Sequence, residues 1–302
     1  MAYDVVIIGG GPAGLAAGIY VKRAMLNALL IEKIGIGGQI LITDLVENYP
    51  GFLETSGADL SRKFEQHALK FGLEIKSIVE VTGIEDRGEM KVVKTSEGDL
   101  ETKAVIIAAG TTPRRLGAKG ELNFIGRGVS YCATCDGFFF REKVVVVVGG
   151  GDSAITEAIF LTKMAKKVII VHRRDKLRAE KINQEHAFAN PKISFAWDSV
   201  VEEIAGKQVV EKVMVRNVKT NELSEIKTDG VFIYVGLIPN TGFADVEKDE
   251  GGFIIANGKM ETSVRGIFVA GDCRVTPLRQ IATAVGDGAI AAVSAEKYLE
   301  GI

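Results

Sequence analysis

Short runs of apolar residues followed directly by glycines divide the sequence into two similar halves. Tyr3–Ile8 is the first run and leads into GGGPAG at residues 9–14, and Val144–Val148 is the second and leads into GGGDSA at residues 149–154. Runs of β-branched residues of this length predict buried strands, and the apolar spacing that follows predicts a helix through Ala24 and another to about Lys166. Each half therefore begins with a strand, a glycine turn and a helix.

Both halves continue and close in the same way. A second strand is predicted at Ala28–Ile31 in the first half and at Val168–Val171 in the second. A closing strand that runs into a Gly–Pro turn is predicted at Ala104–Ala109 and again at Val231–Val235. Strands that alternate with helices in this order are typical of parallel βαβ units. The sequence therefore contains two nucleotide-binding units of one design.

The segment from about Gly242 onward does not start a third unit. It contains one short predicted strand, Gly266–Ala270, and an alanine-rich helix from about Gln280 to Leu299, and about 60 residues rarely fold alone. We therefore expect an α/β fold of two Rossmann-like domains, with the second inserted into the first. The predicted boundaries are 1–113 with 244–302 for the first domain and 114–243 for the second.

Composition and charge argue against some classes of function. The 302 residues are 47% hydrophobic and 25% charged, as in ordinary globular proteins. The 37 basic and 39 acidic residues nearly balance, which argues against binding to nucleic acid or to a membrane surface. Neither a leader peptide nor a stretch of about 20 apolar residues is recognisable, so we expect a cytoplasmic protein.

The glycine turns have the spacing of a dinucleotide fingerprint, which is G-x-G-x-x-G in the first unit and G-x-G-x-x-A in the second, where Ala154 takes the third position. Its first glycine, here Gly9 or Gly149, makes the tight turn, and the second, Gly11 or Gly151, lets the backbone approach a pyrophosphate. The helix that follows offers free N–H groups to the phosphates. Alone the motif is weak, but here it occurs twice, each time between a strand and a helix.

The ends of the two second strands assign different ligands to the two units. Glu32 can accept hydrogen bonds from an adenosine ribose diol, which fits FAD or NAD. Arg173, Arg174 and Arg178 stand where an acid would otherwise be and fit the 2′-phosphate of NADP, although a solvated helix start remains the alternative for them. FAD is favoured over NAD at the first site by residues that could reach along a flavin, namely Gly38, Gln39, Asn48, Gly271 and Asp272.

A C-x-x-C motif lies just before the second fingerprint. Cys132 and Cys135 can close a small disulfide and can have lowered thiol pKa values. A zinc site would need two more ligands at suitable spacing, and the sequence offers none, so no metal is expected. Burial beside a disulfide would raise the pKa of Asp136 and make it a proton donor. The run FFF at residues 138–140 is expected to pack in the core, with one or two rings forming a docking patch as the sharper alternative.

At this point the sequence resembles the low-molecular-weight thioredoxin reductases of bacteria and archaea. The resemblance covers the whole chain through GGGPAG, GGQ, VENYPG, CATCDGFFF, GGGDSA, HRRDKLRAEK, FVAGD and RQIATAVGDG. It implies that NADPH reduces FAD, that FAD reduces the Cys132–Cys135 disulfide, and that this pair reduces thioredoxin. Cys135 would be the thiol nearest the flavin, Cys132 the thiol that attacks thioredoxin, and Asp136 the acid.

The resemblance also implies the cofactor contacts and a homodimer. Arg279, Gln280 and Ile281 would contact the flavin ring, and the backbone of Val81 would hold the adenine. The other FAD contacts would be Ala13, Lys33, Thr43, Ala109 and Gly110. The other NADPH contacts would be Asp152, Ser153, Ala154, His172, Gly236 and Ile238. One departure is Thr156, which stands where the family often has an acid.

Other electron donors and roles are left open by the sequence. A thioredoxin reductase supplied by ferredoxin or NADH could carry the same CATC motif, but its three arginines would then have no role. A redox-sensing flavoprotein would not need a site for a 2′-phosphate. Cys273 has no assigned role, and we expect it to be a small buried residue.

Overall fold

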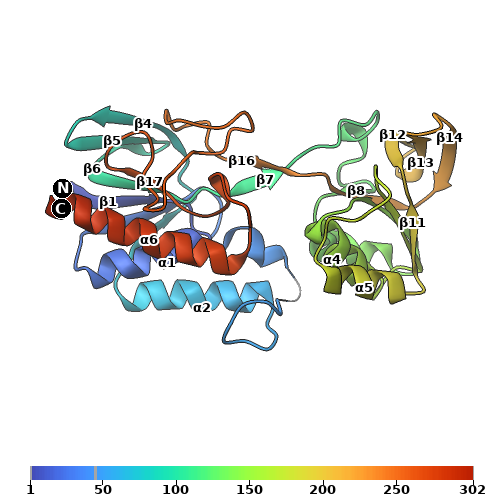
Figure 1. Ribbon diagram of the computed structural model, residues 1–302, viewed down its shortest axis with the longest axis horizontal. Helices are drawn as coiled ribbons and strands as arrows, with labels where there is room; N and C mark the ends of the chain where they lie inside the picture. The colour runs from blue at the N-terminus through green and yellow to red at the C-terminus, as the bar shows by residue number, and fades with distance from the viewer. Residues whose placement is uncertain (1, 44–45, 302) are drawn as a thin grey trace. The chain divides into compact units, whose positions relative to one another are not determined.

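The computed structural model describes residues 2–43 and 46–301 and divides them into two compact units (Figure 1). Unit 1 runs up to Thr112 and resumes at Ile238, and unit 2 extends from Pro113 to Leu237. The chain thus leaves unit 1, builds unit 2 and returns. The second crossing falls between Leu237 and Ile238, ahead of the position 243 expected from the sequence.

A parallel sheet with β1 at its centre forms the core of unit 1. From one edge its parallel strands are β3 (Glu74–Ser77), β2 (Ala28–Glu32), β1 (Tyr3–Ile8), β6 (Gly98–Ile107) and β17 (Ile267–Val269). The first half of β6 instead pairs antiparallel with β5 (Met90–Thr95), which pairs with β4 (Val81–Arg87). β6 therefore belongs to the parallel sheet and to an antiparallel meander.

Helices α1 (Pro12–Arg23) and α6 (Ile281–Glu300) pack on one face of this sheet, and α2 (Gly57–Lys70) packs against α1 (Figure 1). The backbones of α1 and α6 come very close, because a Cβ on Gly288 would lie 2.1 Å from the carbonyl oxygen of Ala13. Only glycine permits such an approach. The short 3₁₀ helices η1 (Gly38–Ile42) and η4 (Gly271–Cys273) complete the unit.

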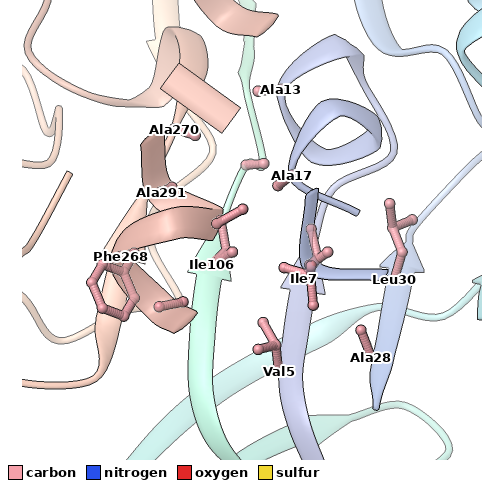
Figure 2. Close-up of a cluster of buried hydrophobic side chains, with 14 of the residues drawn as sticks. Val5, Ile7, Ala13, Ala17, Ala28, Leu30, Ile106, Phe268, Ala270 and Ala291 are labelled. Atoms are coloured by element: carbon pink, nitrogen blue, oxygen red, sulfur yellow. The ribbon is translucent and has the colours of Figure 1, made fainter. Parts of the chain in front are cut away.

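Both faces of β1 are buried over its last four residues, which explains the apolar run from Val5 to Ile8. Val5 and Ile7 point toward α1 and α6 and pack with Leu30 and Ile106 (Figure 2). The intervening residues, Val6 and Ile8, belong to a second buried cluster on the other face of the sheet. Strands covered on both faces have continuous rather than alternating hydrophobicity.

Unit 2 repeats the parallel design around β9. The strand order is β11 (Ile193–Ala196), β10 (Lys167–Val171), β9 (Val144–Gly149), β15 (Gly230–Tyr234) and β8 (Val129–Ser130). Its helices are α3 (Ala133–Asp136), α4 (Asp152–Leu161) and α5 (Lys181–Ala189), with η2 (Leu122–Phe124) and η3 (Gly137–Phe140). A separate antiparallel sheet contains β12 (Ser199–Gly206), β13 (Val210–Asn217) and β14 (Leu223–Lys227).

The two connecting segments pair with each other as a small sheet of β7 (Thr111–Pro113) and β16 (Leu237–Pro239). The expected α/β class with two Rossmann-like units is confirmed. The predicted helix to Lys166 was too long, since α4 ends at Leu161 in a turn closed by the bond from the N–H of Ala165 to the carbonyl of Leu161 at 2.8 Å. Within the described ranges, no helix is long and apolar enough to cross a membrane.

Candidate functional site

Each glycine turn connects the central strand of its unit to the helix that follows. In unit 1, Gly9 ends β1 with a φ of +112° and Gly11 is the N-cap of α1. In unit 2, Gly149 ends β9 with a φ of +150° and Gly151 is the N-cap of α4. A glycine cap has no side chain to bond the first N–H groups of its helix, which leaves these groups free to bind a ligand phosphate.

The space around the glycines shows which of them serve the fold and which leave space for a ligand. A Cβ on Gly9 would lie 2.2 Å from the carbonyl oxygen of Ala108, and one on Gly149 would lie 2.4 Å from that of Tyr234. A Cβ on Gly11 would meet only the Cα of Gly38, at 3.9 Å, and one on Gly151 would meet no described atom within 4 Å. The open space at these second glycines fits the close approach of a pyrophosphate.

The middle glycines are held alike in both units. The N–H of Gly37 donates to the carbonyl of Gly10 at 2.8 Å, and the N–H of Arg178 donates to that of Gly150 at 2.7 Å. In unit 1 the carboxylate of Glu32 also accepts the N–H of Gly10 at 2.7 Å. A carboxylate has about four acceptor positions, so Glu32 keeps positions for a ribose diol.

His172, not an arginine, occupies the position that corresponds to Glu32. Both residues directly follow the last residue of the second strand that pairs with the central strand, β1 or β9, and the arginines come in the loop after His172. The expectation that the arginines replace the acid itself was therefore wrong by one position. The ring of His172 lies against Gly150, and its Nε2 is 3.1 Å from the carbonyl oxygen of Lys176. Burial and then the arginines Arg178, Arg174 and Arg173 lower the pKa of His172, so its ring is neutral at pH 7.

The three predicted arginines meet at one cavity of about 440 Å³. Its walls are the loop of residues 173–178 together with Asp198, Val218 and Lys219. A cavity of this size lies within the usual range for small ligands, and its guanidinium groups suit a phosphate. We name it the basic cavity. Gly236 and Ile238 lie instead on the second connecting segment and are not among its lining residues.

Asp152 has a structural role that the sequence did not reveal. Its carboxylate accepts the N–H of Glu180 at 2.7 Å and the side-chain amide of Asn183 at 3.2 Å. Asp152 begins α4, and Glu180 follows the arginine loop. The carboxylate therefore fixes that loop to the glycine turn. Its neighbours Ser153 and Ala154 lie in the first turn of α4, and Ala154 is buried.

In unit 1 the carboxylate-bearing turn at Gly271–Asp272 is held by a buried ion pair. Arg274 binds Asp287 through two hydrogen bonds of 2.7 and 2.8 Å, and Asp287 also accepts the N–H of Gly271 at 3.1 Å. Bidentate pairs of this kind fix geometry strongly. Burial raises the pKa of Asp272, and the nearby Arg279 partly offsets that rise. Asp287 and Arg274 position this turn, and no sequence motif pairs them.

The predicted ring contacts gather at the start of α6. Gln280 is the N-cap of α6 in a capping box with Thr283, and its side-chain oxygen accepts the amide of Asn48 at 3.1 Å. The guanidinium of Arg279 lies 4.2 Å from the centre of the Phe253 ring. Ile281, the first residue of α6, packs beside a small buried cluster that contains Ile40 and Leu60. Phe253 was missed because it is far away in the sequence.

The remaining residues expected near a flavin also lie in unit 1. Gln39 donates to the carbonyl and hydroxyl oxygens of Thr111 at 2.9 and 2.6 Å, and Asn240 holds Ala109 and Gly110 with bonds of 2.9 and 3.0 Å. The others lie in or beside the elements of that unit: Ala13 in α1, Lys33 in an exposed ion pair with Glu80, Gly38 facing Gly11, Thr43 at the end of η1, and Val81 at the start of β4.

Cys132 and Cys135 form a disulfide at the short helix α3 in unit 2. The Sγ of Cys132 accepts the N–H of Cys135 at 3.0 Å, and Cys135 is exposed at the surface of the unit. Asp136 ends α3 and is half-buried. Within residues 2–43 and 46–301, no three His, Cys, Asp or Glu side chains are grouped to hold a metal ion. Cys273 is fully buried in unit 1, as expected, and burial raises the pKa of its thiol to about 11.

Tyr234 links the glycine turn of unit 2 to the redox helix. Its hydroxyl accepts the N–H of Ala133 at 2.9 Å, and its carbonyl oxygen packs against Gly149. Sequence analysis missed this residue, because an aromatic at a strand end is an ordinary core position.

Replacing Tyr234 with phenylalanine should expose the redox helix to exchange with solvent. A buried N–H without its acceptor costs about 1–3 kcal/mol, so we expect the Ala133 amide to exchange at least about fivefold faster. Hydrogen exchange followed by mass spectrometry would measure this rate. Tyr20→Phe, at an exposed tyrosine of α1, is the matched control, and an unchanged rate in Tyr234→Phe would contradict the role assigned to this hydroxyl.

Comparison with known proteins identifies the family to which this arrangement of sites belongs. The family model of pyridine nucleotide-disulphide oxidoreductases matches residues 3–288. The thioredoxin reductase of Bacillus subtilis is 50% identical over 305 residues, which cover 99% of this chain and 95% of that protein. The crystal structure of Lactococcus lactis thioredoxin reductase has a TM-score of 0.97 at 47% identity and covers 99% of this chain and 100% of its own. That of T. acidophilum thioredoxin reductase has a TM-score of 0.95 at 38% identity, with 98% of each chain covered.

The match to the family model extends over nearly the whole chain and includes both glycine turns and the disulfide. The chain therefore belongs to the pyridine nucleotide-disulphide oxidoreductases and, within them, to the thioredoxin reductases. It is an oxidoreductase, and its cofactors are FAD and NADPH. The prediction of a thioredoxin reductase is confirmed over the redox-sensor alternative.

Proposed function

We propose that the protein uses NADPH to reduce the disulfide of thioredoxin, and that its own Cys132–Cys135 disulfide delivers the electrons. The observation that carries the proposal is the disulfide itself, which lies in the same unit as a dinucleotide turn and the basic cavity. Unit 1 supplies the second dinucleotide turn, with the acid Glu32 at the position that His172 occupies in unit 2. Two cofactor sites and one accessible disulfide form a complete path from a two-electron donor to a protein disulfide.

The residues of unit 1 suit FAD. Gly9 and Gly11 would face its pyrophosphate, Glu32 its ribose, Asp272 its ribityl chain, and the segment Arg279–Ile281 its ring. When bound, FAD accepts a hydride from NADPH and supplies two electrons to a disulfide, which a nicotinamide does not do readily. The ion pair of Arg274 and Asp287 keeps the Asp272 turn in place for this contact.

The thiol chemistry belongs to α3. Two electrons and two protons convert the disulfide to the thiols of Cys132 and Cys135. The Cys132 thiolate, stabilised by the N–H of Cys135, attacks thioredoxin's disulfide and forms a mixed disulfide, and one thioredoxin thiolate leaves. Cys135 then attacks Cys132 and releases the second, which restores the original bond. Asp136, at the end of α3, is the acid that protonates a leaving thiolate.

NADPH is the donor that the basic cavity favours over NADH or ferredoxin. Its arginines have a use only if the dinucleotide carries a 2′-phosphate. The purified protein should be yellow, and under anaerobic conditions NADPH should bleach it at lower concentrations than NADH. A preparation that is colourless, or one that NADPH does not bleach, would contradict the proposal.

Two exposed phenylalanines fit the docking of thioredoxin. Phe140 is buried against Phe232, whereas Phe138 and Phe139 have 66% and 68% of their surface exposed directly after the redox helix. The expected packing in the core therefore holds for Phe140 alone, and the exposure of the other two rings supports the docking alternative. Adjacent exposed aromatics are typical of protein contacts.

The double substitution Phe138→Ala and Phe139→Ala should raise KM for thioredoxin by about tenfold or more, because interface aromatics commonly contribute more than about 1 kcal/mol each. The rate with a small aromatic disulfide should stay unchanged, since that substrate does not need a docking patch. Leu53→Ala, at an exposed apolar residue of unit 1, is the control. Equal losses with both disulfide substrates would contradict the docking role.

We also infer a cytoplasmic homodimer. The redox-active pair needs a reducing compartment in which its thiols persist. Exposed apolar residues on α1 and α6, including Tyr20, Ile290 and Val293, line a groove of about 740 Å³ that a second copy could cover. Sedimentation of the holoenzyme should give twice the mass of one chain, and a monomer would contradict this inference.

A further inference from the structure

Lys219 lines the wall of the basic cavity opposite the arginine loop and does not belong to any of the sequence motifs. We propose that Lys219 is a specificity-determining residue for NADPH, which neutralises two carboxylates of the cavity and places a cation opposite the arginines. The inference rests on the proposed function, because it concerns the donor that the cavity selects. Lys219 lies in the turn between β13 and β14.

The two walls of the cavity are tied together through the backbone. One wall is the arginine loop after β10, and the other is formed by Asp198, which precedes β12, and by the β13–β14 turn. The N–H of Asp198 donates to the carbonyl of Arg174 at 3.3 Å, and the carbonyl of Asp198 accepts the N–H of Val218 at 2.6 Å. These bonds place the backbone of Lys219, the next residue, beside the arginine loop.

Lys219 is paired with both acids of the cavity. Its Nζ lies 2.9 Å from Asp198 Oδ2 and 3.5 Å from Asp175 Oδ2. Asp198 has a φ of +50°, a conformation that aspartate tolerates better than most residues, and its side chain is only 17% exposed. Its carboxylate is thus mostly buried at the cavity wall, where Lys219 is its ion-pair partner.

The charges that line the basic cavity explain why the ion pairs of Lys219 should affect nucleotide binding. The lining contains the cations Arg173, Arg174, Lys176, Arg178 and Lys219 and the anions Asp175 and Asp198. Without Lys219, neither carboxylate would have this compensating cation beside it, near a phosphate that carries about two negative charges at pH 7. NADH lacks the 2′-phosphate, so this repulsion would weaken the binding of NADPH more than that of NADH.

The test compares nucleotides that differ only in the 2′-phosphate. In Lys219→Gln we expect the Kd of adenosine 2′,5′-bisphosphate and KM for NADPH to rise about fivefold, as befits partly screened surface charges. The Kd of 5′-AMP, KM for NADH and kcat should stay unchanged. The rise in this Kd and in KM for NADPH should be smaller at high salt, because salt screens the charges. Titration calorimetry on the holoenzyme gives the two dissociation constants independently of turnover.

Three variants separate charge from structure. Lys219→Arg keeps the cation and should bind both nucleotides as the wild type does. Lys212→Gln removes a lysine that is ion-paired with Glu225 at 2.7 Å in the same sheet but outside the cavity, and it should change neither constant. Adding Asp175→Asn to Lys219→Gln removes one of the released carboxylates and should recover part of the lost affinity.

Two outcomes would overturn the role of Lys219 without contradicting NADPH as the donor. One is an unchanged Kd of adenosine 2′,5′-bisphosphate in Lys219→Gln. The other is an equal loss for 5′-AMP, which would mean that the cavity wall had collapsed. A wild-type protein that did not distinguish the two nucleotides would contradict the proposed donor as well, so the two failures can be told apart.

Discussion

Replacing Cys132 with serine should abolish thioredoxin reduction while NADPH still bleaches the flavin. The serine cannot attack a disulfide at a useful rate, and turnover should fall by at least about three orders of magnitude. The flavin is reduced before the disulfide takes part, so its bleaching should persist. Thioredoxin-dependent oxidation of NADPH and the anaerobic flavin spectrum measure the two halves of the reaction. Loss of both would contradict the division between cofactor and thiol chemistry.

The roles of the two cysteines can be distinguished by trapping the mixed disulfide with thioredoxin. In Cys135→Ser, the remaining Cys132 thiol should form a stable mixed disulfide with thioredoxin, because no second thiol is present to resolve it. Cys132→Ser should trap none. The matched control is Cys273→Ser, which alters a buried thiol that contacts the carbonyl oxygens of Ile107 and Ala270 and should leave turnover intact. Trapping by Cys132→Ser instead would reverse the roles assigned to the pair.

Gly14→Ala should produce a protein without flavin. Gly14 lies in the first turn of α1, and a Cβ there would be 1.9 Å from the carbonyl oxygen of Gly9. Because the atom in the way is backbone, the glycine turn of unit 1 would have to open and lose the shape that receives the pyrophosphate. We expect flavin absorbance per chain to fall by at least about tenfold, since a distortion that costs more than about 1.4 kcal/mol of binding has this effect.

Gly35→Ala is the control for this result, because its Cβ would meet no described atom within 4 Å. It should keep the flavin content of the wild type. Binding of adenosine 2′,5′-bisphosphate to unit 2 should survive in Gly14→Ala, since the core of unit 2 is separate from that of unit 1. Normal flavin content in Gly14→Ala would show that the turn is less constrained than the packing of Gly9 and Gly14 indicates.

The elements nearest the glycine turns were predictable because their signals are local. β1 spans the predicted Tyr3–Ile8, and β2 and β10 differ from the prediction by one residue. α2 was missed, although Ser56 accepts the N–H of Asp59 as an N-cap and Leu60, Phe64 and Ala68 follow at helical spacing. α2 connects the parallel strands β2 and β3, and it was missed because the residues after β2 were interpreted only as candidate flavin contacts.

The sequence alone determined the two dinucleotide turns, the repeated α/β design, the redox pair and the arginines near the second turn. These features follow from backbone requirements and apolar runs within a few residues of one another, where local chemistry is decisive. Only the tertiary structure decided that His172 corresponds to Glu32, that Asp287 holds the Asp272 turn, that Tyr234 holds the redox helix and that Lys219 faces the arginines. Each of these depends on which distant strands and turns pack together, and burial of the shared cores selects those partners without leaving a short-range pattern in the sequence.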